Sequence, residues 1–251
     1  MKSGLVSISF RKLSVLEIVR LASEAGLECI EWGGDIHVPH GDVAAAREAA
    51  KLTAVHGLSV SAYGSYLSLG VGGDPGLESV VETAVALGAP TIRVWAGKKS
   101  SAEATVEDRV AVVDAALAAA ELAAANGLSI SYEFHANTLT DTAESAAELF
   151  AETLHDAIRS FWQPPNGDGV EEALASLEVV IPRLSNVHAF HWWPDPAARL
   201  PLAEGLDRWS TYLDRIRLAG LQPDVLLEFL PGDDPGLLAS EAATLLELLK
   251  P

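Results

Sequence analysis

Along the chain, Ala- and Leu-rich stretches with helical spacing repeatedly end in glycine and give way to a short apolar run. The pattern is seen in ASEAGLECIEW, LTAVHGLSVSAY, AVALGAPTIRVW, LAAANGLSISYEF and IRLAGLQPDVLLEF. Glycine most easily takes the left-handed conformation that ends a helix, so a helix end followed by a strand is predicted at each of these positions. The glycines are Gly26, Gly57, Gly88, Gly127 and Gly220, and the first three are spaced 31 residues apart, the length of one strand–helix unit.

Eight such units are predicted along the chain. Their strands lie at residues 4–10, 27–32, 58–63, 90–95, 128–134, 158–163, 186–191 and 224–229. Helical patterns separate them, and the clearest, TVEDRVAVVDAALAAAELAAANG, has acidic residues in its first turn. Strands that alternate with helices predict a parallel sheet, and eight repeats without a shift in composition predict a single (βα)8 TIM barrel over residues 1–251. An open doubly wound sheet is the alternative, but SISFRKLS in the first unit lacks the GxGxxG motif.

Composition narrows the range of partners. A chain of 251 residues with 49% hydrophobic content can bury a large core. The formal charge of −18, from 17 basic and 35 acidic residues, disfavours nucleic acid or an anionic membrane as a partner, because both attract basic proteins. One cysteine, Cys29, excludes an internal disulfide and a cluster of thiolate ligands. Since MKSGLVSISFRKLSVLEIVRLA has no uninterrupted apolar stretch and no later segment has a membrane-spanning length, we expect a cytoplasmic location.

Polar side chains gather where the predicted strands end. In SISYEFHANT, strand alternation places Ser131, Glu133 and His135 on one face and bulky residues on the other. The solvated edge of a sheet would explain this pattern, but in a (βα)8 barrel the carboxyl ends of the strands form the active-site mouth. In DVLLEF the same alternation directs Glu228 to the mouth. We therefore expect Glu133 and Glu228 to converge in one cavity.

The seventh predicted strand, NVHAFHWW, contains two histidines of opposite parity, so a regular strand cannot direct both inward. We favour His191, because it lies at the end of the strand and because Val187 and Ala189 then point inward with it. His188 is accordingly expected in the outer layer. The sixth strand ends in RSFWQPPN and offers Gln163 to the mouth.

The segments IEWGGDIHVP, IRVWAG, SYEFH, FWQPPN, VHAFHWW and LLEF resemble the xylose-isomerase-like TIM barrels, a family of sugar phosphate isomerases and epimerases that includes the ketose 3-epimerases. The resemblance covers essentially the whole chain. It implies one divalent cation with ligands from strands five to eight, which correspond to Glu133, Gln163, His191 and Glu228. It also implies that the two glutamates act as acid and base. Gln163 departs from the family pattern, since many relatives have aspartate there, and Asn166 stands where relatives often have histidine.

The departure at Gln163 changes the expected metal chemistry. A glutamine oxygen can coordinate a hard or borderline cation but brings no charge, so weaker metal binding is expected. An oxygen-rich set with one imidazole and no thiolate suits Mn²⁺, Mg²⁺ or Co²⁺ better than Zn²⁺, which it could still accept. The alternative is that Gln163 marks a lineage that has lost the metal.

Further residues near the strand ends are expected to contact a substrate. Tryptophan faces suit the C–H faces of sugars, arginines bind phosphate or carboxylate, and a histidine in the Gly-rich loop after the second strand could lie on a lid. The expected contacts are His37, Tyr63, Arg93, Trp95, His135, Trp162, Trp192 and Arg199. Rim packing for the aromatic residues, ion pairs for the arginines and simple solvation for the loop histidine are the alternatives. Glu31 fits the site or the upper barrel layer equally well.

These features predict a metal-dependent isomerase or epimerase of a small sugar, sugar phosphate or polyol ketone. One glutamate would remove a proton beside a carbonyl, giving an enediolate, and the other would return it to the opposite face or to the neighbouring carbon. A non-catalytic or metal-free sugar-binding barrel is the alternative, although binding alone does not need two opposed carboxylates. A DNA-repair endonuclease of this superfamily would need a multi-zinc cluster and a basic surface, which seven histidines and a charge of −18 do not support. The sequence leaves a homo-oligomer open.

Overall fold

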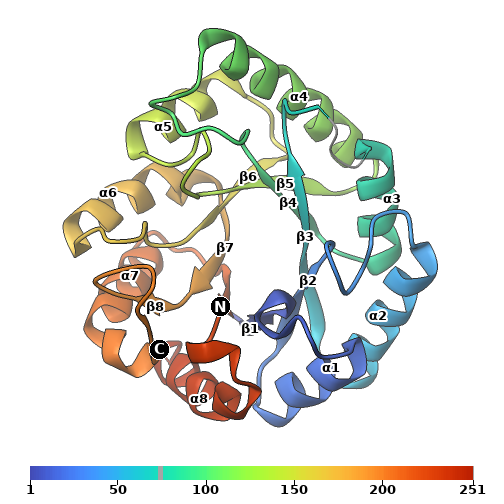
Figure 1. The fold of residues 1–251 in the computed structure, drawn as a ribbon, viewed down its shortest axis with the longest axis vertical. Helices are drawn as coiled ribbons and strands as arrows, with labels where there is room; N and C mark the ends of the chain where they lie inside the picture. Colours follow the sequence, from blue (N-terminus) through green and yellow to red (C-terminus); the bar gives the residue numbers. More distant parts are fainter. Residues whose placement is uncertain (73–75, 251) are drawn as a thin grey trace.

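The computed structural model describes residues 1–72 and 76–250, in which eight parallel strands close into a barrel surrounded by helices (Figure 1). The barrel strands are β1 (Ser3–Val6), β2 (Cys29–Gly33), β3 (Ser59–Ser68), β4 (Thr91–Trp95), β5 (Ser129–Glu133), β6 (Ile158–Trp162), β7 (Leu184–Ala189) and β10 (Asp224–Leu227). Each strand pairs with its neighbours in chain order, and β10 closes the ring against β1. The predicted (βα)8 barrel is confirmed, and the open doubly wound sheet is wrong.

The helices follow the strands as the repeat predicts. They are α1 (Val15–Glu24), α2 (Val43–Val55), α3 (Leu77–Leu87), α4 (Val106–Ala125), α5 (Ala143–Glu152), α6 (Val170–Val180), α7 (Leu206–Leu218) and α8 (Leu238–Leu248). The glycines predicted to end helices all have positive φ, from 73° to 77°. Helix α4 begins with a capping box in which the Thr105 side chain and Asp108 satisfy each other's backbone N–H groups. Among the described helices, none combines the length and the apolar composition needed to cross a membrane.

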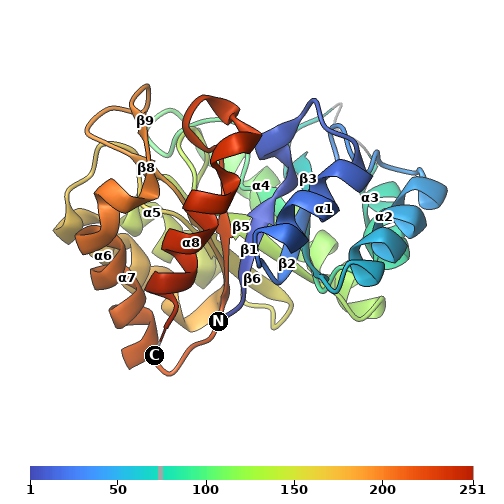
Figure 2. The same cartoon turned by 90° about the horizontal axis from the view of Figure 1, so that it is seen from below.

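Three strands differ from the sequence prediction in ways that affect the site. The first strand ends at Val6, and Ser7–Phe10 forms a 3-10 helix instead. Strand β3 continues to Ser68 and its register against β4 shifts between Gly64 and Leu67, as at a β-bulge. Strand β7 begins at Leu184 and ends at Ala189, after which β8 (His191–Trp192) and β9 (Arg199–Leu200) form a separate antiparallel hairpin. This hairpin lies at the end of the barrel opposite to the two chain termini (Figure 2).

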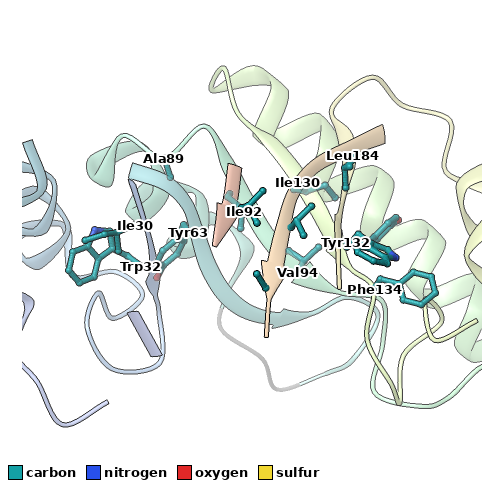
Figure 3. Packing of buried hydrophobic residues seen from close by; sticks show 14 of the residues in the cluster. Ile30, Trp32, Tyr63, Ala89, Ile92, Val94, Ile130, Tyr132, Phe134 and Leu184 are labelled. Carbon is teal, nitrogen blue, oxygen red and sulfur yellow. The ribbon is translucent and has the colours of Figure 1, made fainter. Parts of the chain in front are cut away.

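Side-chain alternation divides the buried residues into two groups. Outward-facing residues of the strands, such as Ile92, Val94 and Tyr132, join the helices in the main hydrophobic core (Figure 3). A separate cluster of buried apolar residues fills the barrel interior, and consists of Val6, Ile8, Cys29, Ala62, Phe161 and Leu226. The interior cluster is small, and polar side chains occupy the rest of the interior at the carboxyl ends of the strands, where (βα)8 barrels have their active sites.

Candidate metal and active site

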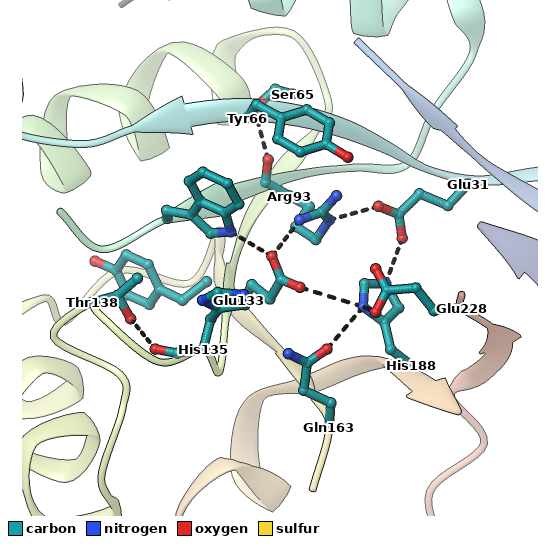
Figure 4. A network of polar contacts seen from close by, with 12 residues as sticks. Glu31, Ser65, Tyr66, Arg93, Glu133, His135, Thr138, Gln163, His188 and Glu228 are labelled. Carbon is teal, nitrogen blue, oxygen red and sulfur yellow. Dashed lines mark hydrogen bonds and ion pairs between the residues drawn. The ribbon is translucent and has the colours of Figure 1, made fainter. Parts of the chain in front are cut away.

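Arg93 and Glu133 form the centre of a buried polar network at the carboxyl ends of β4 and β5 (Figure 4). The Arg93 guanidinium, only 2% exposed, pairs with Glu31 through Nε at 2.6 Å and with Glu133 Oε2 through Nη1. Trp95 Nε1 donates a second hydrogen bond to Glu133 Oε2 at 2.5 Å. These donors fix the Glu133 carboxylate and leave its other oxygen, Oε1, directed at His188 on β7, two strands away along the barrel wall.

His188 is fully buried near the end of β7. Its Nε2 lies 2.8 Å from Glu31 Oε2. Its Nδ1 lies 3.2 Å from Gln163 Oε1 and 3.5 Å from both Glu133 Oε1 and Glu228 Oε2. One ring nitrogen therefore faces the barrel wall, and the other faces a set of three oxygen atoms.

The buried charges shift one another's pKa values strongly. Burial would lower the pKa of His188, but the carboxylates of Glu228 and Glu31 outweigh it and raise that pKa to about 10. Burial also opposes ionisation of Glu133, yet Arg93 and His188 hold the pKa of this carboxyl well below its usual range. For Glu228 burial dominates, and its pKa is raised. Glu133 is thus the strongly stabilised anion, and Glu228 the carboxylate with the higher proton affinity.

The donor set fits a divalent cation. Ligand atoms of Glu133, His188 and Glu228 all lie within 4.8 Å of one another, and Gln163 Oε1 lies beside them. Separations of 3.2 to 3.5 Å suit atoms that would share an ion at about 2.0–2.2 Å. Three buried carboxylates, those of Glu31, Glu133 and Glu228, meet one guanidinium and the His188 imidazole, whose raised pKa favours its charged form. When His188 gives up its proton to become a ligand, two negative charges remain for a cation to balance.

A cavity of about 200 Å³ opens above these groups. Its lining consists of Ile8, Arg11, Tyr66, Arg93, Trp95, Glu133, His135, Gln163, Asn166, Phe190, Trp192, Glu228 and Phe229. A second cavity of about 550 Å³, between the loops that follow β5 and β6, shares His135, Gln163 and Asn166 with it. The convergence predicted for Glu133, Gln163 and Glu228 is therefore observed. Arg93, Trp95, His135 and Trp192, four of the eight predicted substrate contacts, line the same cavity.

The expectation that His191 faces the site is wrong, because β7 ends two residues earlier. His191 belongs to the β8–β9 hairpin, where it pairs with Leu200. Its ring lies against Gly205, where an added Cβ would be 2.5 Å from Nδ1. His188 takes the inward position, while Val187 and Ala189 pack in the outer core. Alternation of polar and apolar residues from Asn186 to Ala189 was the signal that could have identified it.

Three expected substrate contacts face away from the cavity. Tyr63 lies in the outer core and donates to Val38 O at 2.8 Å. Trp162 packs between the barrel and α7, and its Nε1 donates to Ser176 Oγ at 2.9 Å. His37 is buried in the loop after β2, with ring nitrogens 3.1 Å from Ser7 Oγ and 3.2 Å from Leu13 O. These residues stabilise the barrel wall and do not reach the polar network.

Arg199 lies at the rim, outside the set of residues that line the cavity. Its guanidinium pairs with Asp233 at 2.9 Å and lies 4.8 Å from the ring centres of both Trp192 and Phe229. The ion pair and the stacking account for its position, in agreement with the alternative that this arginine forms a structural ion pair. Arg199 therefore supports the aromatic wall of the cavity from outside.

Tyr66 is a cavity residue that the sequence pattern does not predict. The β3 bulge leaves Tyr66 out of register and in the left-handed region, with φ of 56°. Its ring lies 5.2 Å from the Arg93 guanidinium and 5.4 Å from the Trp95 ring. The one available signal was Gly64, since glycine within a strand often marks a bulge.

Comparisons with known proteins agree with this fold. A family model described as xylose isomerase-like TIM barrel matches residues 19–249. A 3-dehydroshikimate dehydratase from Bacillus anthracis is 29% identical over 170 residues, which are 63% of this chain and 60% of that protein, so less than two thirds of the relative is matched.

Two solved structures show the same architecture. The probable 3-DHS dehydratase involved in petrobactin synthesis, from Bacillus anthracis, has a TM-score of 0.82 at 23% identity over 98% of this chain and 99% of that one. The 3-keto-D-glucoside 4-epimerase from E. coli has a TM-score of 0.73 at 18% identity over 99% and 98% of the two chains. At these identities the likeness shows the fold alone.

Proposed function

We propose that this chain, which belongs to the xylose isomerase-like TIM barrel family, is a metal-dependent enzyme that removes a proton beside the carbonyl group of a small polyhydroxylated ketone. The observation that carries the proposal is the convergence of Glu133, His188 and Glu228 in a buried cavity, with Gln163 Oε1 beside them. Mn²⁺, Mg²⁺ or Co²⁺ suits two carboxylates, an imidazole and an amide oxygen. When bound, the cation would supply electrostatic stabilisation of the negative charge that develops on the substrate oxygen.

The two glutamates are suited to different tasks. Glu133 Oε2 already accepts hydrogen bonds from Arg93 and Trp95, so Oε1 is the atom that can bind a cation. Glu228 contacts His188 at 3.5 Å and receives no hydrogen bond from the described residues. Because no such donor in the described part of the chain engages its carboxylate, Glu228 is the better proton acceptor. We therefore assign to Glu228 the removal of the proton that gives the enediolate. We assign to Glu133 mainly the role of a metal ligand, and only secondarily that of the second proton donor.

The fate of the enediolate separates two candidate activities. Return of the proton to the neighbouring carbon or to the opposite face gives an isomerase or an epimerase. Loss of a hydroxyl group as water from the adjacent carbon gives a dehydratase. The second candidate is supported by the dehydratase relative and by the engagement of Glu133 Oε2. Dehydration balances with one carboxylate, because the proton that Glu228 takes from carbon can be given to the departing hydroxyl group, which leaves as water.

A solvent-exchange experiment tests the proposal. Protein stripped with EDTA and reloaded with Mn²⁺, Mg²⁺ or Co²⁺ is incubated in D₂O with small ketoses, their phosphates and 3-dehydroshikimate. Deuterium bound to carbon would indicate an isomerase or epimerase, and an unsaturated product that absorbs ultraviolet light would indicate a dehydratase. Both signals should disappear in Glu228→Gln and without metal. Tight binding of these ligands without exchange or product would contradict the proposal and favour a non-catalytic binding barrel.

A further inference from the structure

Glu31 is a fully buried carboxylate near the end of β2, and neither of its oxygens faces the cavity freely. Oε1 accepts a hydrogen bond from Arg93 Nε at 2.6 Å. Oε2 lies 2.8 Å from His188 Nε2. Glu31, on strand β2, thus links Arg93 and His188 within the polar network (Figure 4).

The contact with His188 determines which nitrogen of the imidazole can bind a metal. An ionised carboxylate only accepts hydrogen bonds, so His188 Nε2 must carry a proton to donate to Glu31. The lone pair of the metal-binding form is then on Nδ1, the nitrogen that faces Gln163, Glu133 and Glu228. We propose that Glu31 is a positioning residue that holds the His188 ring with Nδ1 directed at the cation, an inference that rests on the metal-dependent function proposed above.

Through its contact with Arg93, Glu31 also positions a second predicted metal ligand, Glu133. Arg93 binds Glu31 through Nε and Glu133 Oε2 through Nη1, so one planar guanidinium spans both carboxylates. The contacts form a chain from His188 through Glu31 and Arg93 to Glu133. A single residue that does not touch the cation therefore sets the orientation of two ligands, a role that outer partners of metal ligands commonly have.

Strand β3 leaves the space that this chain of contacts requires. A Cβ added at Gly64 would lie 2.6 Å from Glu31 Oε1 and 2.8 Å from Arg93 Nη2. Gly64→Ala would therefore displace both side chains without changing any ionisable group. It offers a second way to disturb the positioning of the ligands.

Glu31→Gln tests the proposal directly. Its amide nitrogen cannot accept a hydrogen bond, so the side chain can satisfy either Arg93 or His188 but not both. Calorimetric titration with Mn²⁺ should show affinity about 10- to 100-fold weaker than in the wild type. Gly64→Ala should weaken binding in the same direction, and Glu31→Asp, which keeps the charge but is shorter, should lie between Glu31→Gln and the wild type.

Nitrogen NMR of the Zn²⁺-loaded protein provides a readout that general destabilisation would not change. The wild type should show His188 coordinated through Nδ1 and protonated at Nε2. The spectrum of Glu31→Gln should no longer show this one form alone. Asn186→Ala is the matched control, because it removes a buried polar group two residues before His188 on the same strand, where Asn186 bonds Ser61 at 2.8 Å. It should lower thermal stability and leave Mn²⁺ affinity unchanged.

The outcomes separate this inference from the proposed function. Wild-type protein that binds no divalent cation would overturn both. Wild-type binding with equal affinity in Glu31→Gln, Glu31→Asp and Gly64→Ala would overturn the positioning role alone. Circular dichroism on each variant identifies any that fail to fold, and the remaining variants decide the result.

Discussion

The barrel interior has two polar layers that differ in how their hydrogen bonds are completed. In the lower layer, near the amino ends of the strands, Asn186 donates to Ser61, and Ser61 donates to Asp224, each at 2.8 Å. Thr91 and Ser131 bond each other there at 2.7 Å. These short side chains satisfy one another across the barrel interior and, for Thr91 and Ser131, between the neighbouring strands β4 and β5, so this layer stabilises the closed barrel.

The upper layer has larger groups, more charge and incomplete pairing. Three carboxylates surround one arginine and one histidine, and His188 Nδ1 faces three oxygens at 3.2 to 3.5 Å. Arg93 Nη2 is buried without a hydrogen-bond partner among the described residues. Such an arrangement is costly in a folded protein unless a ligand completes it. The contrast assigns barrel stability to the lower layer and the proposed chemistry to the upper layer.

The largest effect is expected from Glu228→Gln in the upper layer. Loss of a general base typically lowers the rate about 10²- to 10⁴-fold, and the substitution keeps the shape of the side chain. Turnover in the deuterium-exchange assay should fall by this amount while the thermal midpoint stays close to that of the wild type. Activity within a few-fold of the wild type would remove Glu228 from the proton-transfer step.

Substitutions of Trp162 and Trp95 distinguish a residue that packs in the barrel wall from one that lines the cavity. Trp162 is fully buried against Tyr212, so Trp162→Ala should cost about 3–5 kcal/mol of unfolding free energy in denaturant titrations. Trp95→Phe should change stability little but weaken Mn²⁺ and substrate binding, because the hydrogen bond to Glu133 is lost. The reverse pattern would show that the two tryptophans have been assigned to the wrong faces.

Asn186→Ala should reveal the structural role of the lower layer. Removing its amide leaves Ser61 without this donor in a buried position, which typically costs about 1–3 kcal/mol. Chemical denaturation should show this loss, whereas kcat should be unchanged in the folded protein. A loss of kcat without a loss of stability would contradict the division between the layers.

The smallest effect is expected from Gln163→Asp. A negative charge beside the cation should tighten Mn²⁺ binding by about tenfold or more at a partly screened dielectric, although the shorter side chain offsets part of the gain. Titration calorimetry compares the two proteins, with Gln163→Asn as the control for length. Equal or weaker binding in the aspartate variant would mean that Gln163 binds the substrate and not the metal.

Much of this site could be predicted where the strands are regular. Glu133 and Glu228 follow the alternation of β5 and β10, and both reach the cavity as expected. Arg93 and Trp95 lie two residues apart on β4 and also face inward. At these strands, period-two patterning and the position of the barrel mouth were sufficient.

Prediction failed where the strand boundary or register was not visible in the pattern. Extending the seventh strand to His191 reversed its parity and excluded His188. The bulge in β3 turned Tyr66 inward, whereas Tyr63 was expected there. Trp162 was chosen for its aromatic character near a strand end, although Gln163, the next residue, already required the opposite face. A one-residue error in register moves a side chain to the other side of the barrel wall.

Calorimetric titration of Mn²⁺ into the wild type, His188→Ala and His191→Ala tests the central claim most directly. The two histidines are three residues apart and both are buried, but only His188 lies within reach of Glu133 and Glu228. We expect the wild type and His191→Ala to bind one Mn²⁺ with similar affinity, and His188→Ala to bind at least about 10- to 100-fold more weakly, since even an outer partner typically contributes this much. Retained affinity in His188→Ala together with a loss in His191→Ala would contradict the account.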